Sequence, residues 1–163
     1  MVILLMGVSG SGKSTIGKLL AERLGFAFHD ADDFHPAANV EKMRGGEPLT
    51  DADRDAWLET LARLVDRLVR DRQDAVLACS ALKEGYRARL RDGYRDVLVV
   101  YLRGDPELIR SRLQDRKGHF MKASLLDSQL ATLEEPRDAL VVDVAAAPAT
   151  IVERIRSALG LVE

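Results

Sequence analysis

The residues best suited to chemistry lie near the N-terminus, where glycines, hydroxyl side chains and one lysine recur at fixed spacing. The stretch is Gly7-Val8-Ser9-Gly10-Ser11-Gly12-Lys13-Ser14-Thr15, and it matches the pattern G-x-x-x-x-G-K-[ST]. Glycine lets a backbone wrap closely around phosphate oxygens, and the N–H groups at a helix start can donate to them. We therefore expect these nine residues, called the phosphate loop below, to bind a nucleoside triphosphate. Lys13 is expected to reach the β- and γ-phosphates, and Ser14 to ligate Mg²⁺.

The flanking segments give this motif the context that its chemistry requires. Val2–Met6 is a continuous apolar run of strand length, and residues 16–24 have a helical pattern that Gly25 closes. The phosphate loop is thus predicted to connect a buried strand to a helix N-terminus. A glycine-rich turn with only a linking role is the alternative, and the agreement of pattern and context disfavours it.

Further along the chain, strand-like runs alternate with helical patterns, as in parallel βαβ units. Strands are predicted at residues 2–6, 26–29, 75–78, 97–102 and 140–142. Helices are predicted most clearly at residues 52–72, 106–116 and 148–159. This order predicts an α/β protein with a five-stranded parallel sheet. Residues 35–49 and 117–122 do not have a core pattern and are expected to face a substrate or to move.

Length and composition exclude several classes of protein. With 163 residues and no internal repeat, residues 1–163 are expected to form a single domain. Cys79 has no partner for a disulfide, which fits a reducing cytoplasmic setting. No run approaches the roughly 20 apolar residues of a membrane span. The formal net charge of -2 argues against a nucleic-acid partner.

Acidic side chains follow the second predicted strand, on the side of a parallel sheet where ligands bind. Asp30, Asp32 and Asp33 lie there, whereas the third strand ends in Cys79 and Ser80 without a carboxylate. One aspartate would help to hold Mg²⁺, and another would accept the proton of a substrate hydroxyl. Asp30 is assigned to the metal side and Asp32 to the base, with Asp33 as a competitor for either role. A solvated acidic turn is the alternative.

Several cations are candidates for binding an anionic substrate. Arg54 lies in the first turn of the helix at residues 52–72, where it either clamps a carboxylate or pairs with nearby acids. Lys83 and Arg87 are spaced i,i+4, and they form either a basic substrate wall or a solvated face.

A further group of cations precedes Gly118. Arg112 is expected to contact the nucleotide, and Arg116 to reach the transferring phosphoryl group from a lid at about residues 116–124. His119 is expected to donate to substrate or phosphate. The three histidines lack the spacing of metal ligands.

Together these blocks make the chain resemble the gluconokinases, small P-loop kinases related to shikimate and nucleoside monophosphate kinases. Beyond the phosphate loop, the resemblance rests on six blocks that run in order to about residue 136. They are Asp30-Ala31-Asp32-Asp33-Phe34-His35-Pro36, Pro48-Leu49-Thr50-Asp51, Asp53-Arg54, Cys79-Ser80-Ala81-Leu82-Lys83, Gly118-His119-Phe120-Met121 and Ser128-Gln129.

The resemblance implies a three-layer αβα P-loop kinase fold with a mobile lid, and a protein that works as a homodimer. It also implies that the protein transfers a phosphoryl group from ATP to the 6-hydroxyl of D-gluconate. Arginine or lysine would then bind the gluconate carboxylate, and its hydroxyls would contact Asp32, Asp33, His35 and His119. A kinase for another small anionic acceptor, such as shikimate or a nucleoside monophosphate, is the first alternative. A nucleotide-switched binding module is the second, and the chain lacks the Asn-Lys-x-Asp motif that specifies guanine.

Overall fold

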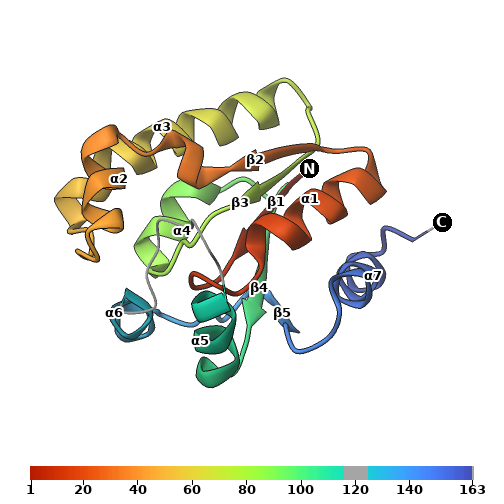
Figure 1. The fold of residues 1–163 in the computed structure, drawn as a ribbon. Coiled ribbons are helices and arrows are strands. Elements are labelled where there is room, and N and C mark those ends of the chain that lie inside the picture. Colours follow the sequence, from red (N-terminus) through yellow and green to blue (C-terminus); the bar gives the residue numbers. More distant parts are fainter. Residues whose placement is uncertain (116–124, 163) are drawn as a thin grey trace.

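The computed structural model describes residues 1–115 and 125–162, and its centre is one sheet of five parallel strands (Figure 1). The strand order is β2-β3-β1-β4-β5. The strands are β1 (Val2–Met6), β2 (Ala27–Asp30), β3 (Ala75–Ala78), β4 (Val97–Arg103) and β5 (Leu140–Asp143). All five residues of the central strand β1 are buried, because both faces of the sheet are covered. The predicted α/β class and parallel sheet are confirmed.

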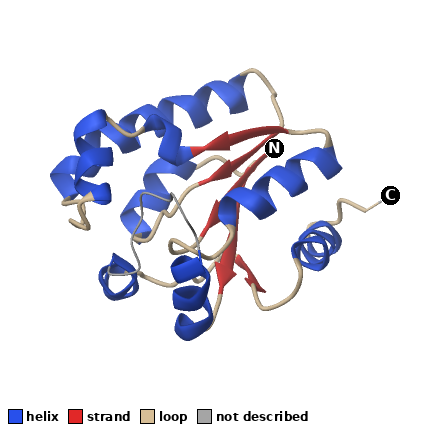
Figure 2. Cartoon of the chain, in the orientation of Figure 1, coloured by secondary structure: helices blue, strands red, loops and turns tan. Residues whose placement is uncertain are grey.

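Helices cover both faces of the sheet (Figure 2). They are α1 (Lys13–Leu24), α2 (Ala37–Arg44), α3 (Asp51–Arg70), α4 (Glu84–Arg91), α5 (Pro106–Asp115), α6 (Leu126–Thr132) and α7 (Pro148–Ala158). A short 3₁₀ helix, η1 (Ala31–Phe34), follows β2. Successive side chains of β1 point to opposite faces. Leu4 packs in a cluster with residues of α3 and α4, while Ile3 packs with residues of α1 and α7. The result is three layers, helices–sheet–helices, and none of the described helices is long and apolar enough to cross a membrane.

The element boundaries differ from the sequence prediction by one or two residues in most places. Strand β2 lies one residue further along than predicted. Helix α3 ends two residues early, since Arg72 adopts a left-handed backbone with φ 53°. The larger errors are two helices that were not predicted, α2 and α6. The expectation that residues 35–49 lie outside the core is wrong for Asn39 and Met43, which are buried on α2. The predicted lid at residues 116–124 lies outside the described residues.

Two contacts fasten α2 to the start of α3. Thr50 and Asp53 form the capping box that begins α3, as the sequence suggests. The Asp53 carboxylate also accepts from Lys42 Nζ at 2.9 Å, and its backbone carbonyl accepts from Asn39 Nδ2 at 2.8 Å. The segment between α2 and α3 is therefore held at both ends.

A buried arginine joins α4 to the segment that follows α6. The Arg87 side chain is 2% exposed. Its guanidinium donates to the carbonyls of Ala81 at 2.8 Å, Leu82 at 3.1 Å and Glu134 at 2.7 Å, and to the Glu84 carboxylate at 2.8 Å. These carbonyls lie in irregular backbone, so Arg87 supplies the donors that a helix or sheet would otherwise provide.

This arrangement predicts a structural role for Arg87. Replacing it by methionine keeps the length of the side chain but removes the donor to the buried Ala81 carbonyl and the donor to the Glu134 carbonyl. The Leu82 carbonyl still accepts from the N–H of Glu134 at 2.8 Å. A buried polar group left without a partner costs about 1–3 kcal/mol. We expect Arg87→Met to lower the free energy of unfolding by several kcal/mol, measured by urea denaturation.

The matched control is Arg89→Met on the same helix. Arg89 pairs with Asp55 and Glu59 at the surface, where such pairs contribute about 0–1 kcal/mol. Equal losses of stability in the two variants would contradict the role assigned to Arg87.

Candidate active site

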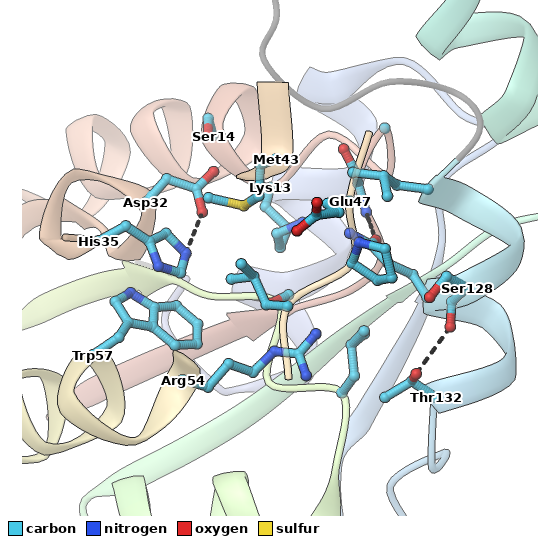
Figure 3. A pocket seen from close by; sticks show the side chains of 18 of the residues that line it. Lys13, Ser14, Asp32, His35, Met43, Glu47, Arg54, Trp57, Ser128 and Thr132 are labelled. Atoms are coloured by element: carbon cyan, nitrogen blue, oxygen red, sulfur yellow. Dashed lines mark hydrogen bonds and ion pairs between the residues drawn. The ribbon is translucent and has the colours of Figure 1, made fainter. Parts of the chain in front are cut away.

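A cavity lies at the carboxyl end of the sheet, where the phosphate loop, η1, α3 and α6 meet (Figure 3). Its space is about 830 Å³ when the open solvent at its mouth is included. Five of its lining residues belong to the phosphate loop: Ser9, Gly10, Gly12, Lys13 and Ser14. The cavity therefore lies at the end of the sheet where the sequence predicts that ligands bind.

The phosphate loop has the backbone shape that its glycines permit. Gly10 and Gly12 have left-handed φ values of 85° and 97°, which residues with a side chain rarely adopt. A Cβ on Gly10 would also come within 2.8 Å of Leu113 Cγ, so the loop packs directly against α5. Helix α1 begins at Lys13, and the first turn contains no acid that would compete for an anion at the helix N-terminus. Lys13 Nζ donates to the Val8 carbonyl at 3.0 Å.

The last residue of β2, Asp30, is bound to the phosphate loop. Ser14 Oγ donates to Asp30 Oδ2 at 2.5 Å, and Asp30 Oδ1 accepts from the backbone N–H of Asp32 at 3.0 Å. A hydroxyl and a carboxylate oxygen are hard donors of the kind that Mg²⁺ prefers. No cluster of three or more potential metal-binding side chains occurs in the described part of the chain. The pair fits a magnesium ion that takes most of its other ligands from phosphates and water, as is usual for this ion.

Asp32 lies on the cavity wall, whereas Asp33 is exposed and does not line the cavity. The Asp32 side chain is 38% exposed, and its carboxylate still loses much of its hydration inside the cavity. This desolvation raises the pKa of Asp32 to about 6, with Lys13 opposing and the carboxylates of Asp30 and Asp33 adding to the rise. Of the three aspartates, Asp32 has the position and the pKa of a base for a bound hydroxyl.

An aromatic pair supports the turn that carries Asp32. Trp57 on α3 is 2% exposed, and its Nε1 donates to the Ala31 carbonyl at 2.7 Å. The His35 ring stacks on Trp57 with centroids 4.2 Å apart, and its Nε2 lies 3.7 Å from Asp32 Oδ1. Burial, with a smaller effect of Arg54, lowers the pKa of His35 to about 4. His35 is therefore neutral at physiological pH and lies where it can contact both Asp32 and a ligand.

Arg54 projects into the cavity across from Asp32 (Figure 3). Its side chain is 17% exposed, and its guanidinium lies 5.9 Å from the centre of the Tyr86 ring. The Asp51 carboxylate is 4.0 Å away and accepts instead from Lys83 Nζ at 3.0 Å and from the Tyr86 hydroxyl. Among the described residues, Arg54 and Lys13 are the arginine and lysine side chains on the cavity wall. Arg54 is thus placed to meet an anionic group of a ligand.

Other predicted site residues do not line the cavity. Lys83 is engaged by Asp51 at the surface, and Arg87 is corrected from a substrate wall to a buried structural residue, because its donors are used by backbone carbonyls. Arg112 Nη2 donates to the Val144 carbonyl at 2.8 Å, close to the loop before α7. Thr15 is exposed on α1. Arg116 and His119 lie outside the described residues.

Ser128 and Gln129 are part of the family resemblance, but the sequence predicted neither helix α6, on which they lie, nor a role for them in the site. Ser128, Gln129 and Thr132 line the cavity from this helix, and Gln129 Oε1 accepts from the backbone N–H of Ser9 at 2.7 Å. The helix is seven residues long, too short for a periodic pattern to reveal. Glu47, Pro48 and Leu49, from the segment expected to face a substrate or to move, also line the cavity.

Comparisons with known proteins agree with this architecture. The sequence matches the shikimate kinase family model over residues 9–159. It is 46% identical over 147 residues to the thermoresistant gluconokinase of Escherichia coli strain K12, a match covering 88% of this chain and 84% of that protein. It is 50% identical over 136 residues to the gluconokinase of Gluconobacter oxydans strain 621H, covering 83% and 76%. The crystal structure of a gluconokinase from Sinorhizobium meliloti 1021 superimposes with a TM-score of 0.85 at 44% identity, covering 98% of this chain and 91% of that one.

Sequence, fold and comparisons lead to the same family. The phosphate loop joins the central strand β1 to α1 at the carboxyl end of a five-stranded parallel sheet, as in the P-loop kinases. The identities to the two relatives extend over most of both chains, well beyond the phosphate loop itself. The chain therefore belongs to the gluconokinase family of P-loop kinases and is an ATP-dependent kinase.

Proposed function

We propose that this chain transfers the γ-phosphoryl group of ATP to the 6-hydroxyl of D-gluconate, giving 6-phosphogluconate. The observation that carries the proposal is the pairing, across one cavity, of a carboxylate beside the phosphate loop with an arginine on the opposite wall. Gluconate has a hydroxyl at one end and a carboxylate at the other, so it can meet Asp32 and Arg54 at once. The names of the relatives support the same substrate.

Each residue of the site has a distinct task in this proposal. Lys13 and the phosphate-loop N–H groups neutralise and orient the phosphates. Ser14 and Asp30 would hold a magnesium ion, which would supply positive charge near the transferring phosphoryl group. Asp32 orients the substrate hydroxyl and accepts its proton, and neutral His35 contacts a neighbouring hydroxyl. Arg54 binds the substrate carboxylate through paired N–H donors.

The remaining expectations are also proposals. Arg112 contacts the nucleotide, and Arg116 and His119 reach the phosphates or the substrate from the lid at residues 116–124. Residues 1–163 act as one kinase domain, working in the cytoplasm as a homodimer without nucleic-acid or membrane partners. The buried thiol of Cys79, whose pKa is raised to about 12 by burial, is suited to a structural role in such a compartment.

The second candidate is a kinase that phosphorylates shikimate, which the match to the shikimate kinase family model favours over other acceptors. Gluconate and shikimate both carry a carboxylate and hydroxyls. ADP release should therefore be compared with gluconate, shikimate and AMP as acceptors at equal concentration. We expect gluconate to give the highest kcat/KM. A rate with gluconate no higher than with ATP alone would refute the proposed substrate.

The role of Arg54 predicts a selective loss of acceptor binding. A hydrogen bond to a charged group contributes about 1.5–3 kcal/mol, so Arg54→Met should raise the KM for gluconate about 10- to 100-fold. The KM for ATP should change little, because Arg54 lies across the cavity from the phosphate loop. The control is Arg63→Met, an exposed arginine on the same helix that pairs with Glu59. An unchanged KM for gluconate in Arg54→Met would place the carboxylate elsewhere.

The raised pKa of Asp32 predicts that removing its charge stabilises the fold, while the proposed role as a base predicts that the same change lowers activity. Because the pKa is about 6 in the fold and 3.8 in the unfolded chain, the folded state holds the proton more tightly, and ionisation of Asp32 destabilises the fold as pH rises from about 4 to 6. Asp32→Asn removes this charge. In the nucleotide-free protein it should raise the Tm at pH 7.5 and leave the Tm at pH 3.5 unchanged, provided that both proteins remain folded there.

The same variant should have a much lower kcat, with ATP affinity largely kept. Asp33→Asn is the matched control, since Asp33 is exposed outside the cavity. If Asp33→Asn loses turnover and Asp32→Asn does not, the base has been assigned to the wrong aspartate.

A further inference from the structure

Helix α6 is anchored in the hydrophobic core beside the phosphate loop. Leu126, at its first position, is 0% exposed and packs in a cluster with Val8 of the loop and with Ile109 and Leu113 of α5. Leu125, directly before the helix, is also buried. The helix therefore has a fixed position from which its side chains can act on the loop.

One of those side chains makes a direct hydrogen bond to the loop backbone. Gln129 Oε1 accepts from the N–H of Ser9 at 2.7 Å, although the two residues are 120 positions apart in the sequence. Ser9 is 7% exposed, so water has little access to replace the lost bond. A buried N–H without an acceptor is costly, and this bond gives Gln129 a hold on the loop.

The phosphate loop needs such an external hydrogen bond because its glycine-rich backbone can adopt many conformations. Gly10, directly after Ser9, has a left-handed φ of 85°, and glycine samples many conformations at little cost. Within the loop, the Val8 carbonyl accepts from the N–H of Ser11 at 3.2 Å and from Lys13 Nζ at 3.0 Å. These bonds organise the inner side of the loop, and Gln129 fixes the residue that enters the glycine turn.

We propose that Gln129 is a positioning residue for phosphoryl transfer, which holds the Ser9 amide and thereby fixes the direction of the N–H groups that receive the ATP phosphates. The inference rests on the proposed function only in that the phosphate loop binds ATP. It makes α6 part of the nucleotide site, although the helix contributes no residue to the sequence motif.

The test uses the full chain and two substitutions of similar length. Gln129→Met removes the acceptor oxygen, and Gln129→Glu keeps an acceptor oxygen but adds a negative charge beside the phosphates. Asp127→Asn is the control on the same helix, since Asp127 pairs with Arg110 at the surface. ATP affinity is measured by isothermal titration with Mg²⁺ and no sugar acid, so a wrong acceptor assignment does not affect the result. Amide hydrogen exchange at Ser9 is followed by NMR.

In Gln129→Met we expect Ser9 exchange to accelerate and ATP binding to weaken, each about tenfold, as expected for the loss of a buried hydrogen bond. In Gln129→Glu the Ser9 amide should remain protected, while ATP binds about tenfold more weakly because a carboxylate repels the phosphates. Asp127→Asn should match the parent protein in both measurements.

Three results would overturn the proposal. Unchanged ATP affinity and Ser9 exchange in Gln129→Met would mean that the loop holds its shape without this bond. Faster exchange throughout β1 and α1, rather than at Ser9 and its neighbours, would mean that Gln129 supports the fold as a whole. Unchanged ATP affinity in Gln129→Glu would also contradict a place beside the phosphates.

Discussion

The hydrogen bond between Ser14 Oγ and Asp30 Oδ2 is the contact on which the rest of the site depends. It joins α1, which follows the central strand, to the end of the edge strand β2, across the end of β3. Strand β3 ends at Ala78, and Cys79 and Ser80 after it offer no carboxylate, so the acid has to come from β2. Asp30 also caps η1, and through that cap it sets the position of Asp32. A single carboxylate thus links the phosphate-binding half of the cavity to the acceptor half.

Irregular backbone surrounds the cavity, and long side chains from helices satisfy its polar groups. Trp57 donates to the Ala31 carbonyl before the reactive aspartate, Gln129 accepts from Ser9 in the phosphate loop, and Arg87 donates to the carbonyls after β3. Buried backbone groups need partners, and side chains supply them where helix and sheet hydrogen bonds do not. These three side chains, from α3, α6 and α4, thus bind backbone groups on or near the cavity wall.

The sequence predicted the parts of this site that depend on local spacing. The phosphate loop, its flanking strand and helix, and the acids after β2 are contiguous patterns, and all were placed correctly in the fold. The roles of Arg87 and Gln129 depend on partners 47 and 120 residues away, which no local pattern reveals. Lys83 and Arg87 appeared to form one basic surface because they are spaced i,i+4, yet one is at the surface and the other is buried. The hydrogen bond from the Trp57 indole to the Ala31 carbonyl could not be inferred from the periodicity of residues 52–72.

The central claim is that the acceptor lies with its carboxylate at Arg54 and its far hydroxyl at Asp32, next to the phosphate loop. The position of the new phosphate on the product tests this orientation directly. The product formed from ATP and uniformly ¹³C-labelled gluconate should be examined by ¹³C and ³¹P NMR for the carbon that couples to phosphorus. This account predicts phosphorus coupling at C6, the end farthest from the carboxylate. Phosphate on a hydroxyl next to the carboxylate would contradict the assigned orientation and the roles of both residues.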